Sequence, residues 1–382
     1  MRSFICKVAS RCDLKCNYCY VYEHADQSWR HQPARMSIEV AALLGQRIAA
    51  HADRHNLRSV DVVFHGGEPL IVGLQHLKDL CETIRRSAEP TEVQFRMQTN
   101  GVLFDEAALK LCLEQRITVG VSCDGPRSAT DRHRLDHFGN SSFDRVCRGL
   151  DVLSSDSGRK IWGGFLTVID LRNSPMETYR FLRSYEPKSI EFLLPLANHD
   201  LSPTGESSGT TPYADWLLEV FAGWYSERPQ TTLIRRFRDV IGLMAGLNTS
   251  SEEWGLQPVD FAVVETNGDL QTVDTLKTAF DGANHIGLNL REHDFEDMLA
   301  HPAVRERQIG ASSLCATCQR CPLVAVCGGG YYPHRYSRQD GFSNPSVYCA
   351  DLQKLIRSIH HVVSDDLKAF AQPARAAIPL VQ

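Results

Sequence analysis

The feature that most limits the fold is an alternation of short apolar segments with helical patterns through the first half of this 382-residue chain. Runs rich in Val, Ile or Phe, each followed by a loop, predict strands at residues 4–8, 60–64, 93–98, 117–122, 161–169 and 189–194. Helical patterns separate them, for example after the capping residue Ser37. Repeated β/α units predict a parallel sheet, and there are too few here to close a TIM barrel. We therefore expect an α/β fold, a partial (β/α)6 barrel.

Three cysteines follow the first predicted strand in the run CDLKCNYC, at Cys12, Cys16 and Cys19. Cysteine thiolates hold iron–sulfur clusters, and three of them leave one iron of a four-iron cluster without a protein ligand. An open position on a metal is where a small molecule binds and reacts. From these residues alone, a zinc knuckle or three unrelated thiols remain the alternatives.

Polar motifs follow the next strands, at the carboxyl ends where barrel enzymes place their chemistry. HGGEPL follows the second strand, QTNG the third and SCDGP the fourth, and DRHR comes shortly after. Each motif alone is compatible with an ordinary turn, but their order behind the cysteine motif is specific. The candidate binding residues in them are Gly66, Gly67, Glu68, Gln98, Asn100, Ser122 and Arg134.

Together these motifs resemble the radical S-adenosylmethionine (SAM) superfamily. The resemblance implies a [4Fe-4S] cluster on the three cysteines, whose open iron binds SAM and whose electron cleaves it to methionine and a 5′-deoxyadenosyl radical. It also implies that the GGE stretch contacts the SAM amino group, and that Asn100, Ser122 and Gln98 lie on the ribose side. Arg134 is the expected partner of the SAM carboxylate.

A second cysteine cluster stands near the C-terminus, in CATCQRCPLVAVCGGG and SVYCADL. Four thiolates suit either a closed iron–sulfur cluster or a structural zinc ion. The spacing resembles the SPASM extension of radical SAM peptide-modifying enzymes. That resemblance implies one auxiliary [4Fe-4S] cluster, with the ligands Cys318, Cys321, Cys327 and Cys349.

A second auxiliary cluster is not expected. Val273 and Tyr331 stand where the fuller pattern has two further cysteine ligands, and there is no Cys between Cys147 and Cys315. Cys315 itself is either a substitute for Cys318 as ligand or a free thiol.

The run CGGGYYPHRYS followed by NPSVYCADL resembles maturases that form three-residue cyclophanes on ribosomal peptides of the FxSxx-COOH type. The resemblance implies that the radical removes a hydrogen from a β-carbon, which then attacks an aromatic ring. Restoring aromaticity requires loss of one proton and one electron, so a base is needed. We expect Asp274 to be that base, because related sulfatase maturases carry a catalytic Asp at the matching place. The alternatives are that Asp274 caps a turn or pairs with Lys277, and Glu265 is a weaker candidate.

Two other functions remain open from the sequence. One is radical SAM oxidation of Ser or Cys to formylglycine, and the other is a non-enzymatic, zinc-stabilised scaffold that binds peptides. The expected partners of the enzyme are a ribosomal precursor peptide and an electron donor such as flavodoxin or ferredoxin. Tyr331, Tyr332, His334 and Arg335 stand beside the cluster ligands, and we expect them to support the site rather than react.

The expected organisation has three parts: a radical SAM barrel at 1–205, bridging helices at 206–255 and an auxiliary-cluster domain at 256–382. Helical patterns at 213–227 and 233–247 form the bridge. Residues 198–212 are rich in Pro, Gly, Ser and Thr, which favours a surface insertion over a substrate lid. How a precursor peptide is held is open, since no leader-binding segment is expected before the barrel.

Composition excludes several classes of partner. The formal net charge is −5, so there is no nucleic-acid footprint, and no apolar run is long enough to cross a bilayer. No signal peptide is seen, and the cysteines cluster at metal-ligand spacing rather than as a disulfide framework. We therefore expect a cytoplasmic enzyme.

Overall fold

The strands lie in a single ten-stranded sheet in the computed structural model, which describes residues 1–203 and 210–376, with side chains up to residue 368. The strand order is β10-β9-β8-β1-β2-β3-β4-β5-β6-β7. The strands are β1 (Ser3–Ala9), β2 (Ser59–Gly66), β3 (Glu92–Thr99), β4 (Ile117–Ser122), β5 (Trp162–Val168), β6 (Ser189–Leu193), β7 (Leu233–Ile234), β8 (Phe261–Val264), β9 (Asp269–Gln271) and β10 (His285–Asn289). The six predicted strands are β1 to β6, parallel and adjacent in chain order, so the predicted α/β partial barrel is confirmed.

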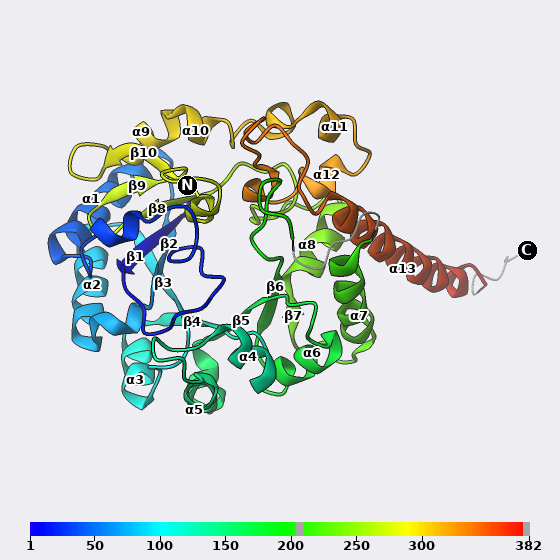
Figure 1. Cartoon of the computed structure of the whole chain (residues 1–382), viewed down its shortest axis with the longest axis horizontal. Coiled ribbons are helices and arrows are strands. Elements are labelled where there is room, and N and C mark those ends of the chain that lie inside the picture. Colours follow the sequence, from blue (N-terminus) through cyan, green and yellow to red (C-terminus); the bar gives the residue numbers. More distant parts are fainter. Residues whose placement is uncertain (204–209, 377–382) are drawn as a thin grey trace, which may run out of the picture.

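Helices cover the outer side of the curved sheet, while the loop after β1 lies inside the curve (Figure 1). The helices are α1 (Ile38–Arg54), α2 (Leu74–Ser87), α3 (Glu106–Gln115), α4 (Arg127–His133), α5 (Phe143–Ser154), α6 (Pro175–Arg183), α7 (Pro212–Ser226), α8 (Arg235–Met244), α9 (Phe295–Ala300), α10 (Pro302–Arg305), α11 (Ala316–Gln319), α12 (Val324–Cys327) and α13 (Cys349–Ala376). The predicted cap Ser37 is confirmed, because its side chain accepts a hydrogen bond from the Val40 amide at the start of α1.

The sheet is larger than the sequence predicted. On one side, β8 from the C-terminal third pairs in parallel with β1, and the antiparallel strands β9 and β10 extend it. On the other side, the two-residue strand β7 pairs with β6. The prediction of a helix from residue 233 is wrong at its start, because Leu233 and Ile234 pair with the sheet edge and α8 begins at Arg235. Pairing with β6 satisfies their backbone groups, which the local pattern cannot reveal.

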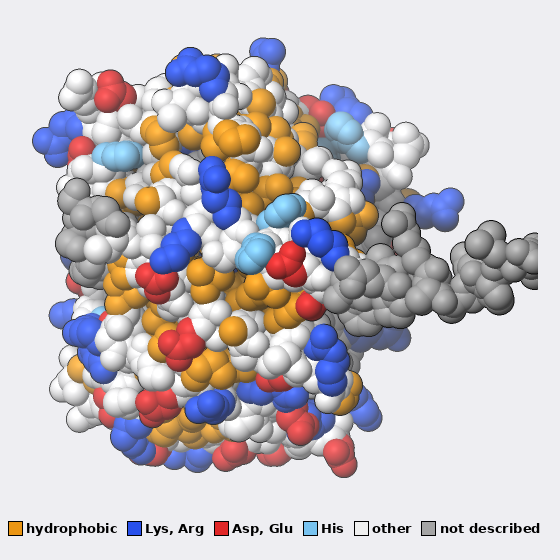
Figure 2. Space-filling view, turned by 90° about the vertical axis from the view of Figure 1, so that its right-hand side faces the viewer, with side chains coloured by type: hydrophobic (Ala, Val, Ile, Leu, Met, Phe, Trp, Pro, Cys, Tyr) orange, Lys and Arg blue, Asp and Glu red, His pale blue; other side chains and the backbone are white. Residues whose placement is uncertain are grey.

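Residues 204–209 of the predicted insertion lie outside the described residues, and α7 begins soon after, at Pro212. None of the helices in the described ranges is long and apolar enough to cross a membrane. Figure 2 views the side that faces right in Figure 1, and Lys or Arg side chains alternate there with Asp or Glu. This mixed face fits the modest net charge of −5.

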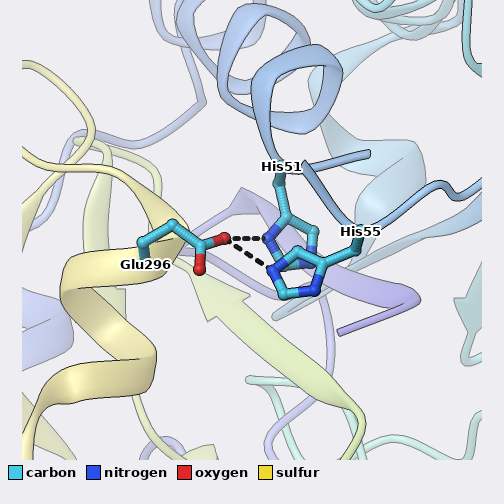
Figure 3. Close-up of side chains that lie close together, drawn as sticks. All are labelled: His51, His55 and Glu296. Carbon is cyan, nitrogen blue, oxygen red and sulfur yellow. Dashed lines mark hydrogen bonds and ion pairs between the residues drawn. The ribbon is translucent and has the colours of Figure 1, made fainter. Parts of the chain in front are cut away.

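A polar contact joins the barrel to the C-terminal part of the chain. His51 Nδ1, in the last turn of α1, and His55 Nε2, at its C-cap, lie 2.7 and 2.9 Å from Glu296 Oε1 on α9 (Figure 3). His51 is 2 % exposed, so it needs this partner, although Glu296 itself is only half-buried. The contact holds α9 against the back of α1.

Candidate active site

A cavity of about 430 Å³ opens at the carboxyl ends of the parallel strands, within the ~300–1,000 Å³ range of small-molecule sites. The three N-terminal cysteines and all but one of the residues assigned to SAM line it. These are Cys12, Cys16, Cys19, Gly66, Gly67, Gln98, Asn100, Ser122 and Arg134. The fold thus brings the sequence motifs of four successive strands to one wall.

The glycines after β2 hold the cysteine loop in place. The Gly67 amide donates to the Ala9 carbonyl at 2.9 Å, and the Glu68 amide donates to the Arg11 carbonyl at 3.0 Å. A Cβ on Gly67 would lie 2.0 Å from the Tyr22 hydroxyl and 2.1 Å from the Arg11 carbonyl oxygen. Only glycine permits this approach of two backbones, so this position fixes the cysteine loop as well as lining the cavity.

Glu68 lies behind the wall of the cavity rather than on it. Its buried carboxylate accepts hydrogen bonds from the Thr99 hydroxyl and the Asn100 amide, both at 2.7 Å, and from the Leu70 amide at 3.1 Å. Burial raises the pKa of Glu68 to about 7, although these donors favour the ionised form. The structure therefore gives this side chain the role of positioning Asn100.

Arg134 is a buried cation on the cavity wall, 6 % exposed. Its Nη1 donates to the Tyr18 hydroxyl at 2.8 Å, and that hydroxyl donates to Asp124 Oδ2 at 2.5 Å. Its Nε is buried and has no hydrogen-bond partner among the described residues. A buried donor left open on a cation fits a carboxylate ligand, as expected for the methionine part of SAM.

Asp274 lies at the base of a cluster of ionisable side chains beside the same cavity. Its carboxylate forms an ion pair with Lys7 Nζ and accepts a hydrogen bond of 2.6 Å from the Tyr20 hydroxyl. Lys7 Nζ also lies 3.3 Å from His65 Nδ1. Tyr20 and His65 are on the cavity wall, whereas Asp274 is 7 % exposed and lies just behind it. Asp274 thus reaches the cavity through Tyr20.

Lys277, the alternative partner considered for Asp274, and Glu265, the weaker candidate for the base, pair with each other. Lys277 Nζ forms a buried ion pair with Glu265 at 3.0 Å. Glu265 is therefore a charge partner of Lys277, and it is not part of the cavity wall.

Opposing effects set the charge states of Asp274 and the side chains around it. Burial acts to raise the pKa of Asp274, but Lys7, His65 and Tyr20 outweigh it and hold that pKa well below its usual range. Burial, with the charge of Lys7, lowers the pKa of His65 to about 4. At neutral pH the site therefore contains a carboxylate behind a phenol and a neutral imidazole.

Sequence reasoning missed Lys7, Tyr20 and His65 as members of the site. Lys7 carried a usable signal, because it is a charged residue inside an otherwise apolar strand and is 3 % exposed. Tyr20 directly follows the last cysteine of the motif, and His65 begins the HGGEPL run. The pairing of β1 with β2 places Lys7 beside His65. The segment after β9 then brings Asp274 into contact with Lys7 and Tyr20.

Four of the five C-terminal cysteines line a second, separate cavity of about 50 Å³. Cys318, Cys321, Cys327 and Cys349 all belong to its wall, whereas Cys315 does not. Burial raises the pKa of the Cys327 thiol to about 11, so a bound metal would have to displace its proton. Four thiols around one small cavity fit a four-thiolate centre.

Neither position expected to have lost a ligand of a second auxiliary cluster holds a cysteine. Val273 is a core residue, 2 % exposed. Tyr331 lies on the wall of the larger cavity, and its hydroxyl is hydrogen-bonded to Thr275.

Comparison with known proteins identifies the barrel. Residues 6–182 match the model of the radical SAM superfamily. These residues form a radical SAM barrel, and the chain is an enzyme. The match covers the cysteine loop, the motifs after β2, β3 and β4, and Arg134. A [4Fe-4S] cluster and SAM are therefore its cofactors, as the sequence predicted.

The relatives extend the match over nearly the whole chain. The chain is 26% identical over 352 residues to a cysteine-type anaerobic sulfatase-maturating enzyme of Clostridium perfringens, covering 89% of this chain and 91% of that protein. It is 25% identical to a serine-type enzyme of Bacteroides thetaiotaomicron, covering 90% and 85%. These relatives are maturases, which agrees with the predicted peptide-modifying class of enzyme.

Two solved structures share the fold. The structure of native anSMEcpe with bound AdoMet and the Cp18Cys peptide has a TM-score of 0.77, at 21% identity, and covers 95% of this chain and 99% of that one. Streptococcus suis SuiB bound to S-adenosylmethionine has a TM-score of 0.60, at 14% identity, and covers 91% and 76%. Their likeness supports the fold, including a C-terminal domain of the SPASM type.

Proposed function

We propose that this enzyme oxidises the β-carbon of a Ser or Cys residue in a peptide or protein, giving formylglycine. The observation that carries the proposal is the contact between Tyr20 on the cavity wall and the ionised Asp274 behind it. It lies in the same cavity as the three cysteines, so proton removal is available beside the radical source. Similarity to sulfatase maturases over about nine-tenths of the chain supports the same reaction.

The reaction removes two hydrogens from a serine side chain. One leaves the β-carbon as a hydrogen atom, and the other leaves the hydroxyl as a proton while one electron departs, so that a C=O bond forms. When bound, the SAM-binding cluster and SAM supply the radical that takes the hydrogen atom, and the auxiliary cluster supplies an acceptor for the electron. For a cysteine, the thioaldehyde formed in the same way is hydrolysed by water, with release of sulfide.

The residues of this chain divide the remaining tasks. Tyr20 takes the proton from the substrate as it passes its own to Asp274, and Lys7 stabilises the carboxylate before transfer. Asn100, Ser122 and Arg134, which line the same cavity, bind and orient SAM. The apolar side of the cavity excludes water from the substrate side chain. It is formed by the carboxyl ends of β5 and β6 and the three residues after β6: Leu166, Val168, Leu193, Leu194, Pro195 and Leu196.

A second candidate is the cyclophane crosslink, in which the β-carbon radical attacks an aromatic ring of the same peptide. The observation that favours it is Tyr331, which contributes an aromatic ring to the cavity wall at a position where the fuller SPASM pattern has a cysteine. In that reaction Asp274 and Tyr20 take the proton that the ring loses. The expected substrate is then a ribosomal precursor peptide. In either case an external one-electron donor such as flavodoxin or ferredoxin reduces the SAM-binding cluster.

An aldehyde-specific hydroxylamine probe separates the two reactions. The reconstituted enzyme is incubated with SAM, a reductant and either a peptide carrying Cys or Ser, or a peptide carrying an aromatic residue two positions from the reacting residue. Formylglycine gives an oxime, whereas a peptide crosslinked with loss of two hydrogens does not and resists fragmentation inside the ring. An oxime on the Cys or Ser peptide supports the first proposal. A crosslink without any oxime overturns it in favour of the second.

A further inference from the structure

Arg335 lies against the loop that closes the four-cysteine cavity. It ends a short helical turn, Tyr332–Arg335, that follows Cys327 and its three glycines, and it is 8 % exposed. The middle glycine, Gly329, is part of the wall of the cysteine cavity. This arginine is therefore held inside the protein next to the proposed auxiliary cluster.

Backbone carbonyls fix the guanidinium of Arg335. Its Nη2 donates to the carbonyls of Gly328 and Gly330 at 2.7 and 2.6 Å, and its Nε donates to that of Gly329 at 3.1 Å. Gly328 has a φ of +61°, and a Cβ there would lie 1.8 Å from the Gly255 carbonyl oxygen. The loop is thus built of residues that let three carbonyls converge on one cation.

Among the described residues, Arg335 forms no ion pair with any Asp or Glu, and the nearby cation Arg307 pairs with Glu252 at 2.9 Å. The ring of Tyr332, 5.6 Å from the guanidinium carbon, gives Arg335 a cation–π contact. The sulfur atoms of Cys318 and Cys327 would also favour its charge as thiolates. Carbonyls and one aromatic ring supply no full negative charge to a buried cation, whereas a thiolate cluster does.

We propose that Arg335 raises the reduction potential of an auxiliary iron–sulfur cluster held by Cys318, Cys321, Cys327 and Cys349. A cluster with four thiolate ligands is anionic and gains another negative charge on reduction, so a buried cation stabilises the reduced form more. A higher potential makes the cluster a better acceptor for the one electron that leaves the substrate. The inference rests on the cluster of the proposed function but not on which peptide product forms.

Redox titration followed by electron paramagnetic resonance tests this without any turnover. The titration uses the full chain in which Cys12, Cys16 and Cys19 are replaced by Ala, so that only the auxiliary cluster gives a signal. Arg335→Gln removes the charge, and Arg335→Lys keeps it. Arg320→Gln is the matched control, because Arg320 lies between two ligands in the sequence but is exposed to solvent.

We expect Arg335→Gln to lower the ratio of reduced to oxidised cluster at least tenfold at a fixed potential, or about 59 mV for a one-electron couple. Arg335→Lys should stay within about threefold of the parent, and Arg320→Gln within about twofold, since water screens an exposed charge. An unchanged ratio in Arg335→Gln, or an equal shift in Arg320→Gln, overturns the proposal. Loss of iron from both Arg335 variants would show that Arg335 is needed to hold the glycine loop in place. That result would also overturn the proposal.

Zinc in place of iron would refute the cluster on which this inference rests. Metal analysis of the same Cys12, Cys16 and Cys19 variant reports that outcome directly. If Arg335→Gln shifts the potential but the parent enzyme forms no formylglycine, the proposed product is refuted and the role of Arg335 stands.

Discussion

The Tyr20 hydroxyl donates a hydrogen bond of 2.6 Å to Asp274, a residue 254 positions away in the chain. Tyr20 belongs to the cysteine loop after β1, and Asp274 follows β9 in the C-terminal part. The contact joins the two halves of the molecule beside the cavity. Neither residue is an expected cluster ligand, so substitutions there can change catalysis without removing a cluster ligand.

Replacing Asp274 by Asn should block product formation after hydrogen abstraction. The variant should keep both clusters and still form 5′-deoxyadenosine, while peptide product falls by ~10²–10⁴-fold, the usual contribution of a general base. Deuterium at the substrate β-carbon should still move into deoxyadenosine, as mass spectrometry would report. Tyr20→Phe should show the same split. If deuterium transfer fails in Asp274→Asn, the residue positions the peptide and the base assignment is wrong.

The same carboxylate should stay ionised across the working range of pH. The pKa of Asp274 is lowered in the folded protein, so its charged form is present above the unfolded value and is lost only as pH falls toward the folded one. We expect no loss of product formation attributable to Asp274 between pH 6 and 8. His65, whose pKa is about 4, should likewise remain neutral there. A rate that falls with a midpoint near pH 7 would point to another group, for which Glu68, with a pKa of about 7, is the first to replace by Gln.

Replacing Arg134 by Ala should weaken SAM binding. A lost charge-assisted hydrogen bond typically costs ~1.5–3 kcal/mol, which is roughly a ten- to hundredfold loss of affinity. Arg132→Ala is the control, because that arginine lies in the last turn of α4, two residues before Arg134, but pairs with Asp170 at 2.8 Å and is not part of the cavity wall. Equilibrium binding of SAM to the anaerobically reconstituted protein measures both. Equal affinity in the two variants would show that Arg134 contacts something other than SAM.

Iron content should follow the two cysteine groups. The full chain should bind about eight irons, and replacing Cys12, Cys16 and Cys19 by Ala should leave about half of them and abolish SAM cleavage. Cys321→Ala should remove most of the remaining auxiliary iron, whereas Cys315→Ala should not, because Cys315 is outside the cavity wall. About twelve irons in the full chain would mean that a further cluster exists.

Replacing Glu296 by Ala should destabilise the fold by ~1–3 kcal/mol, because the buried His51 loses its hydrogen-bond acceptor. Asp53→Ala, an exposed carboxylate on α1, is the control. The parent should also lose stability on acidification. Burial lowers the pKa of His51, so its contribution is lost as pH falls below its unfolded value of 6.5. The two histidines lower the pKa of Glu296 against its own burial, so that contribution is lost only as pH falls below 4.5. Urea midpoints at pH 7.5 and 5.5 measure the first loss, and a midpoint below pH 4.5 measures the second. A Glu296→Ala midpoint equal to the parent would show that the contact is not stabilising.

The sequence by itself determined the class of this protein. The cysteine spacing, the motifs after successive strands and the β/α alternation are local patterns, and each is a property of neighbouring residues. These patterns predicted the strands, the helix caps, and the place of the cysteines and most candidate SAM-binding residues on the cavity wall. A motif at the end of a parallel strand has only one edge of the sheet to occupy.

Only the tertiary structure decided which distant groups meet. Nothing near Lys7 in the sequence indicates that β8 pairs with β1, or that Asp274 then forms an ion pair with the Lys7 ammonium. The same holds for Glu68, which packing turns away from the cavity toward the Asn100 amide, and for Arg335, which closes on three glycine carbonyls. Charge state, burial and hydrogen-bond partners depend on contacts between segments far apart in the chain, and those contacts form only when the sheet assembles.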